Sequence, residues 1–155
     1  MSDTVREVLP SANGTTLYIG LGNSMRGDDF AGSLIVSLID ERDGIVRFDA
    51  GEKPETAYDK ALEVKPAKAV FFDAADMGFP AGTIQIVYED TLSVRSMSTH
   101  KVPLPLITKL IREETGAEIV ICGIQPVSVE FMHKMDESVK ESCETLAKII
   151  NNSRI

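Results

Sequence analysis

Short apolar runs alternate with helical patterns along the chain, and this alternation restricts the fold more than any other feature. The runs, rich in Val, Ile and Phe, lie at 15–22, 45–51, 67–78 (continuing into a loop), 83–88 and 117–124. Helical patterns cover 29–42, 54–63, 103–115 and 136–150. Apolar strands separated by helices are typical of a largely parallel sheet covered on both faces. Because 83–88 follows its predecessor without a helix, it is expected to be an edge strand of opposite direction.

These elements predict one three-layer α/β domain with a five-stranded, mostly parallel sheet and helices on both faces. The 155 residues suit a single domain, expected over 1–155, with polar tails at 1–14 and 151–155. No repeat, linker or low-complexity segment divides the chain. We expect a monomer.

Charge and cysteine content restrict the partners and the compartment. Sixteen Lys and Arg against 24 Asp and Glu give a net charge of −8, which disfavours binding to nucleic acid or anionic lipid. No apolar run approaches the roughly 20 residues that a membrane span needs. Cys122 and Cys143 lack a Cys-x-x-Cys spacing and suit reduced packing thiols. The sequence therefore predicts a cytoplasmic protein without membrane insertion.

Polar residues follow the predicted strands at their carboxyl ends, where open α/β sheets bind ligands. The first strand leads into GLGNSMRGDD, and the others into Asp49 to Glu52, Asp73 to Asp76, and Gln125. In a parallel sheet these ends share one edge. The sequence thus predicts a site where they converge.

The glycine-rich stretch 20–32 lacks the features of a phosphate loop. A Walker loop ends in Gly-Lys-Ser/Thr, whereas Gly27 is followed by Asp28 and Asp29, whose carboxylates repel phosphate. The dinucleotide fingerprint requires a third glycine, and Met25 occupies that place. A nucleotide site is therefore disfavoured.

The acidic residues suit a cation instead. Asp29, Asp73 and His100 offer two oxygens and an imidazole, a mixed set that binds borderline divalent metals. Structural roles compete with this interpretation. Asp28 is interpreted as a cap of the helix N-terminus, and Asp73 and Asp76 also suit turns.

Five segments in order resemble the maturation endopeptidases of nickel-iron hydrogenases: GLGNSMRGDDFAG, DAGEKPE, VFFDAADMGFPAGTI, STHKVPLPLI and CGIQP. The resemblance is greatest to the branch that processes large subunits of membrane-type, hydrogen-evolving hydrogenases. Phe30 is a departure, because many members have glycine there. It puts the shape of the substrate groove in question.

The resemblance implies an enzyme that removes a C-terminal peptide from a hydrogenase large-subunit precursor once nickel is inserted. Asp29, Asp73 and His100 match the residues that recognise this nickel, and they form the expected catalytic set. Other divalent metals are expected to substitute for nickel in the isolated protein. The metal either activates water or only docks the substrate, and we favour docking. Further residues expected in the substrate groove or its turns are Gly22, Asn23, Asp28, Gly51, Asp76 and Gln125.

Two alternatives from other functional classes remain at this point. A non-catalytic, metal-binding maturation chaperone would use the same cation ligands. A receiver-like phospho-signalling domain would also place acidic residues after its first and third strands. Gln125, however, stands where receiver domains carry a lysine.

Overall fold

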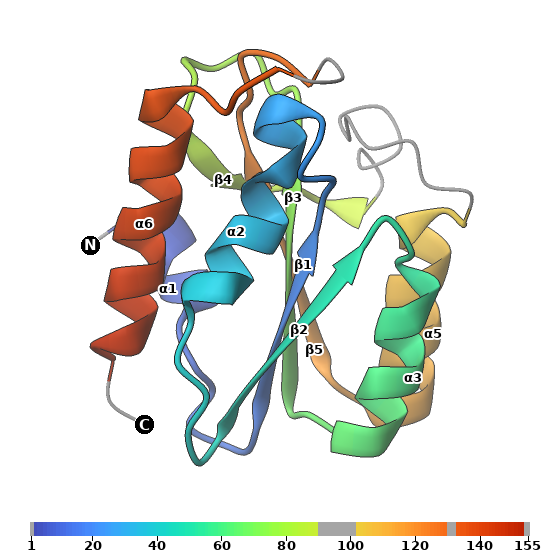
Figure 1. Ribbon diagram of the computed structural model, residues 1–155. Helices are drawn as coiled ribbons and strands as arrows, with labels where there is room; N and C mark the ends of the chain where they lie inside the picture. The colour runs from blue at the N-terminus through green and yellow to red at the C-terminus, as the bar shows by residue number, and fades with distance from the viewer. Residues whose placement is uncertain (1, 90–101, 130–132, 154–155) are drawn as a thin grey trace.

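The computed structural model describes residues 2–89, 102–129 and 133–153. Within them, five strands form one sheet in the order β2-β1-β3-β5-β4 (Figure 1). The strand directions follow the prediction: β1, β2, β3 and β5 are parallel, and β4 runs antiparallel to β5 at the edge. The strands are β1 Thr16–Leu21, β2 Ile45–Gly51, β3 Lys68–Ala74, β4 Ile84–Ile86 and β5 Glu118–Ile124.

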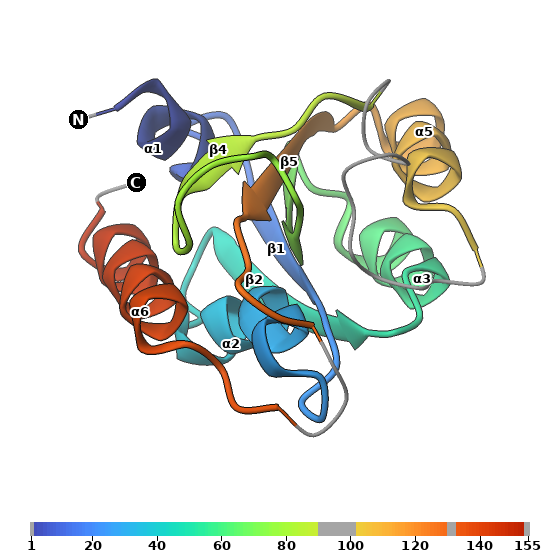
Figure 2. The same ribbon diagram turned by 90° about the horizontal axis from the view of Figure 1, so that it is seen from above.

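Helices cover both faces of the sheet, which confirms the predicted three layers (Figures 1 and 2). One face carries α2 (Ala31–Leu38) and α6 (Glu137–Asn151), which pack on each other. The other carries α3 (Glu55–Val64) and α5 (Leu104–Thr115). Each helix pair encloses its own apolar cluster against the sheet.

The central strands are apolar on both sides, as their near-continuous Val, Ile and Phe runs predicted. Every residue of β1 and β3 is buried. Tyr18 and Phe72 stack with ring centroids 6.0 Å apart, on the face that α2 and α6 cover. The sheet therefore supplies a rigid frame for the loops at its edges.

The N-terminal segment differs from the predicted polar tail. Residues Asp3–Val8 form helix α1, which lies beside β4, and Val8 is fully buried. The Tyr18 hydroxyl donates to the Val8 carbonyl at 2.7 Å, and Lys68 Nζ donates to the Leu9 carbonyl at 2.9 Å. These long-range contacts hold a segment whose polar composition gave no helical signal. At the other end, α6 includes residue 151, so the C-terminal tail begins one residue later than predicted.

The first predicted helix, 29–42, was too long at both ends, because α2 covers only Ala31–Leu38. A 3-10 turn, η1 (Gly27–Phe30), precedes α2, and Phe30 is its last residue. After Leu38, Ile39 has a β-type backbone conformation and is buried. It therefore lengthened the apolar pattern of the sequence although it is not helical. The chain then turns through Gly44, at φ 86°, where Arg42 and Ile45 pair as an antiparallel bridge.

Candidate functional site

The four parallel strands end at one edge of the sheet, where the loops carrying the predicted site residues meet. Strands β1, β2, β3 and β5 end at Leu21, Gly51, Ala74 and Ile124. Figure 2 shows this edge from above, with η1 and the start of α2 beside the strand ends. The predicted convergence of these segments is therefore present in the structure.

Two glycines let η1 and α2 approach the strand ends closely. A Cβ on Gly32 would stand 2.1 Å from the Phe72 carbonyl oxygen and 2.5 Å from that of Leu21. A Cβ on Gly22 would stand 2.2 Å from the carbonyl oxygen of Asp29. Side chains at these positions would push the turn away from the sheet. Glycine therefore places the backbone of Asp29 against β1, beside the end of β3.

Asp29 and Asp73 are both buried at this edge. Their relative exposures are 4% and 1%, and η1 contacts β3, the strand that carries Asp73. Carboxylates in such places must be hydrogen-bonded, paired or bound to a cation, because burial of an isolated charge is costly. The fold thus brings two predicted oxygen ligands to one region.

His100, the third predicted ligand, lies outside the described residues. In the part of the chain that is described, no group of three or more His, Cys, Asp or Glu side chains could hold a metal ion. Asp29 and Asp73 alone would leave a cation incompletely coordinated. Further ligands would have to come from residues beyond that part, from substrate or from water.

Asp28 does not cap a helix, contrary to the interpretation from sequence. Neither η1 nor α2 has a side-chain hydrogen bond at its N-cap. The buried Asp28 carboxylate instead accepts three backbone N–H groups from the chain after β5: Val127 at 2.6 Å, Ser128 at 3.1 Å and Asp136 at 2.7 Å. The two acidic residues therefore differ in role, and Asp28 fixes a loop beside Asp29.

Neighbours of Asp28 reinforce the same contact. The Asp28 N–H donates to the Ser128 carbonyl at 2.9 Å, and Arg26 Nε donates to the Val129 carbonyl at 3.0 Å. Gly27 has φ 56°, a conformation that favours glycine. Sequence reasoning missed this loop, because residues 127–129 bind through backbone groups that carry no sequence signal.

Gln125 organises the loop between β3 and β4. Its Oε1 accepts the N–H of Met77 at 2.6 Å and of Phe79 at 3.4 Å, and its Nε2 donates to Asp76 Oδ1 at 3.2 Å. Asp76 Oδ1 also accepts the Gly78 N–H at 3.3 Å, as expected of a turn residue. In this structure Gln125 and Asp76 shape the wall of the site.

Asn23 and its neighbours tie the loop after β1 to the loop after β2. Asn23 Nδ2 donates to Glu52 Oε1 at 2.9 Å, and its Oδ1 accepts the Met25 N–H at 2.8 Å. The Gly22 N–H donates to the Gly51 carbonyl at 2.9 Å. Gly51, with φ 57°, allows the turn. These residues hold the two loops in a fixed relation.

The chain is similar to known proteins in sequence and in fold. Residues 36–153 match the hydrogenase maturation protease family HycI. The chain belongs to this family. It is 33% identical over 135 residues to the hydrogenase 3 maturation protease of Escherichia coli K12, covering 85% of this chain and 86% of that protein.

Solved structures of hydrogenase maturation proteases share the fold. The crystal structure of HycI from Thermococcus kodakarensis is 33% identical with a TM-score of 0.83, covering 95% of this chain and 96% of that one. The solution structure of the endopeptidase HycI from Escherichia coli is 32% identical with a TM-score of 0.78, covering 88% and 89%. These matches confirm the family resemblance and the predicted fold, and they support a protease.

Family membership bears on the alternatives. Membership of the hydrogenase maturation protease family gives no support to a receiver-like domain. It does not test the metal ligands of this chain. None of the helices in the described ranges is long and apolar enough to cross a membrane.

Proposed function

We propose that this protein is an endopeptidase that removes the C-terminal extension of a NiFe-hydrogenase large-subunit precursor after nickel insertion. Its relatives are named as maturation proteases, and the family match covers most of the chain. The structural observation that carries the proposal is the pair of buried residues Asp29 and Asp73, on η1 and β3, two elements that contact each other at the carboxyl edge of the sheet.

Nickel enters this proposal as part of the substrate. Asp29, Asp73 and His100 would contact nickel that the precursor already holds, and together they supply oxygen and nitrogen donors. His100 stands four residues before Leu104, the first residue of α5, and α5 begins at the same edge of the sheet (Figure 1). Two carboxylates also favour a cationic centre over an anionic one.

The role that we favour for these residues is docking. By binding the nickel, they would place the scissile bond at the edge of the sheet and select the loaded precursor over the empty one. A bound metal ion can also polarise a carbonyl or lower the pKa of water, and either effect would assist hydrolysis. The loops anchored by the buried side chains of Asp28 and Gln125 would hold the site in shape during the reaction.

Cleavage of the precursor tests the function directly. We expect the purified protein to shorten the nickel-loaded precursor by its C-terminal extension and to leave the nickel-free precursor intact, as measured by mass spectrometry. An unchanged mass with nickel-loaded large subunits from each hydrogenase of the source cell would overturn the protease proposal. Equal cleavage of both forms would remove the role of nickel.

Substitutions test the three ligands. Asp29→Asn, Asp73→Asn and His100→Ala should each slow cleavage by about 100-fold, because loss of one partner of a desolvated charge contact costs about 3 kcal/mol. His133→Ala, which changes the other histidine of the chain, is the matched control and should retain activity. Circular dichroism would show that the variants fold. Full activity in the three ligand variants would refute the site assignment.

A further inference from the structure

Three exposed apolar side chains belong to loops at the carboxyl edge of the sheet, and we call them the apolar rim. Met25 follows β1, Phe79 follows β3 and Val127 follows β5. Their relative exposures are 48%, 46% and 64%. Because β1, β3 and β5 are neighbours in the sheet, the ends of these strands lie within about 10 Å of one another. Figure 2 looks down on the loops that leave these strand ends.

Hydrogen bonds join the apolar rim to the candidate site. Each rim residue donates its backbone N–H to a polar side chain of the site, Met25 to Asn23, Phe79 to Gln125 and Val127 to Asp28, at 2.8, 3.4 and 2.6 Å. Two of the acceptors, Gln125 and Asp28, are buried. The rim is therefore fixed in place before a partner binds, which reduces the entropy lost on association.

The position of these side chains distinguishes them from ordinary exposed apolar residues. Apolar side chains scattered singly over a surface are normal, whereas apolar surface gathered around a site indicates binding. Methionine and aromatic side chains are also enriched in protein interfaces. The rim combines one of each with a valine, on three adjacent loops of the site. These features favour a protein partner.

Charge and position select the occupant of the rim. A second copy of the chain would carry the same net charge of −8, so two copies repel each other. The substrate of an endopeptidase, in contrast, has to approach the edge where the candidate site lies. A folded domain presents a surface that meets three loops at once, whereas an extended peptide follows a single line. The body of the substrate therefore fits the rim best.

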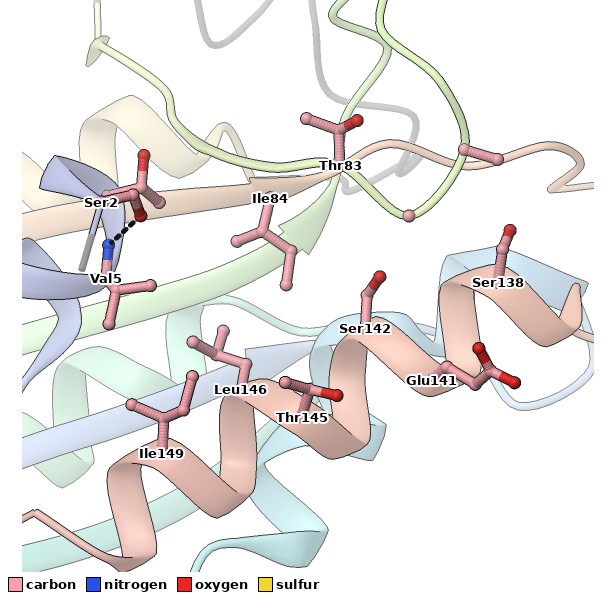
Figure 3. Close-up of a pocket in the computed structure, with 13 residues that line it drawn as sticks. Ser2, Val5, Thr83, Ile84, Ser138, Glu141, Ser142, Thr145, Leu146 and Ile149 are labelled. Atoms are coloured by element: carbon pink, nitrogen blue, oxygen red, sulfur yellow. Dashed lines mark hydrogen bonds between the residues drawn. The ribbon is translucent and has the colours of Figure 1, made fainter.

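A second surface feature lies apart from this edge. A groove of about 590 Å³ is bounded by α1, residues 81–84 and α6 (Figure 3). None of the residues that line it belongs to the apolar rim or to the candidate site. The groove is therefore a reference surface against which substitutions in the rim can be compared.

We propose that the apolar rim binds the body of the large-subunit precursor, through an apolar patch beside its cleavage site. This inference rests on the proposed function and adds the surface that holds the substrate. Contact with nickel distinguishes the loaded precursor from the empty one. The rim adds affinity through buried apolar area, and it discriminates between large subunits by the shape and polarity of the patch that meets it.

Truncation of the rim tests the proposal by kinetics. Met25→Ser and Phe79→Ser remove an exposed apolar side chain and keep the backbone N–H that bonds the site. Each should raise KM for the nickel-loaded precursor about 5- to 10-fold and keep kcat within about twofold, the pattern of lost substrate binding. A triple variant that also carries Val127→Ser should raise KM about 50-fold or more.

Two variants outside the rim serve as controls. Leu62 is an exposed apolar residue near the end of α3, a helix that begins at the carboxyl edge and runs away from it (Figure 1). Thr145 is an exposed residue that lines the groove. Leu62→Ser and Thr145→Trp should both keep KM within about twofold of wild type. Circular dichroism and urea midpoints would show that all variants fold.

The kinetic outcomes separate the two proposals. A wild-type protein that cleaves no precursor would refute the proposed function. A wild-type protein that cleaves, together with a triple variant of unchanged KM, would refute the role of the rim and leave the function standing. An equal rise of KM in the triple variant and in Thr145→Trp would also overturn the rim, because the effect would not depend on the edge of the sheet.

The C-terminal extension is the alternative occupant within the same substrate. A synthetic peptide with the sequence of the extension should inhibit the wild-type protein and the triple variant equally, or inhibit neither. A peptide that loses as much affinity for the triple variant as the precursor does would overturn the proposal, because the rim would then hold the extension.

Sedimentation velocity tests a second copy of the chain as the occupant. The wild-type protein and the triple variant should both sediment as monomers. A wild-type dimer that dissociates in the triple variant would overturn the proposal, because the rim would then be a contact between copies.

Discussion

Asp28 illustrates how one carboxylate can fix a loop beside a proposed site residue, Asp29. It is 1% exposed and accepts three backbone N–H groups, from Val127, Ser128 and Asp136. Hydrogen bonds to a charged group contribute about 1.5–3 kcal/mol each, and a buried donor left without a partner costs a similar amount. The carboxylate therefore stabilises the fold and the wall of the site together.

Asp28→Asn should lower the free energy of unfolding by about 2 to 4 kcal/mol, because the new amide turns an N–H donor toward backbone donors. Urea denaturation measures this change. Asp40→Asn is the matched control, since Asp40 is exposed, and it should change the stability by no more than about 0.5 kcal/mol. Equal urea midpoints for the two variants would show that the Asp28 contacts do not stabilise the fold.

Single residues were predicted unevenly from sequence, for physical reasons. Asp76 bonds the N–H two residues ahead, a local pattern that turn chemistry anticipates. Asp28 bonds residues about 100 positions away, so local reasoning assigned it to the nearest helix. Asp29 and Asp73 were singled out because strand ends converge in this class of fold, whereas the placement of His100 lies outside the described residues.

At the scale of elements, the packing of α2 on the strand ends depends on Gly32. Its missing Cβ leaves room for the carbonyl oxygens of Phe72 and Leu21, which would lie 2.1 and 2.5 Å away from it. Helix α2 can therefore begin directly above β1 and β3. This contact determines where η1, and with it Asp29, stands relative to Asp73.

Gly32→Ala should lower the free energy of unfolding by about 3 kcal/mol or more, because backbone atoms cannot move aside as side chains do. In an open helix the same change would stabilise by up to about 1 kcal/mol, so the sign of the effect is informative. Gly78→Ala is the comparison: nothing lies within 4 Å, and its φ of 75° costs an alanine about 1–2 kcal/mol. Thermal and urea unfolding would rank the two, and a stabilised Gly32→Ala would disprove the close approach.

Most elements were predicted because their patterns are local, and the errors arose where tertiary contacts decide. Strand β2 occupies the predicted residues, and α5 ends at Thr115, as predicted, with Gly116 after it in the left-handed conformation. Helix α1 forms from a polar segment that Val8 anchors in the core. Ile39 has an extended backbone and a buried side chain, so its apolar character led to the prediction of a longer helix.

For the whole molecule, the alternation of apolar strands and helices was sufficient to predict the layers and the edge strand. When helices cover both faces of a parallel sheet, ligands bind at the edge where the strands end and the loops begin. The approximate location of the site therefore follows from the order of elements. The groove that α1, residues 81–84 and α6 line could not be predicted from the order of elements. It depends on where α1 and α6 pack, and the sequence contains no pattern for the space between them.

The two cysteines report on the integrity of the whole fold. Cys122 lies in β5 and Cys143 in α6, both fully buried in the apolar cluster between the sheet and α2 and α6. Burial raises the pKa of the Cys122 thiol, and it raises the pKa of Cys143 to about 12. Since a raised pKa means that the proton is retained to higher pH, both thiols stay protonated and unreactive near pH 8.

Iodoacetamide should therefore label the native protein at pH 8 at least about 100-fold more slowly than the urea-unfolded protein, whose thiols have pKa values near 8.5. Mass spectrometry over time measures both rates, and the unfolded sample shows that the reagent is active. Exposure of the native protein to the reagent should also leave precursor cleavage unchanged, because neither thiol reaches the surface. Rapid labelling without urea would contradict the buried positions of these thiols, and loss of cleavage after labelling would indicate that a cysteine takes part in proteolysis.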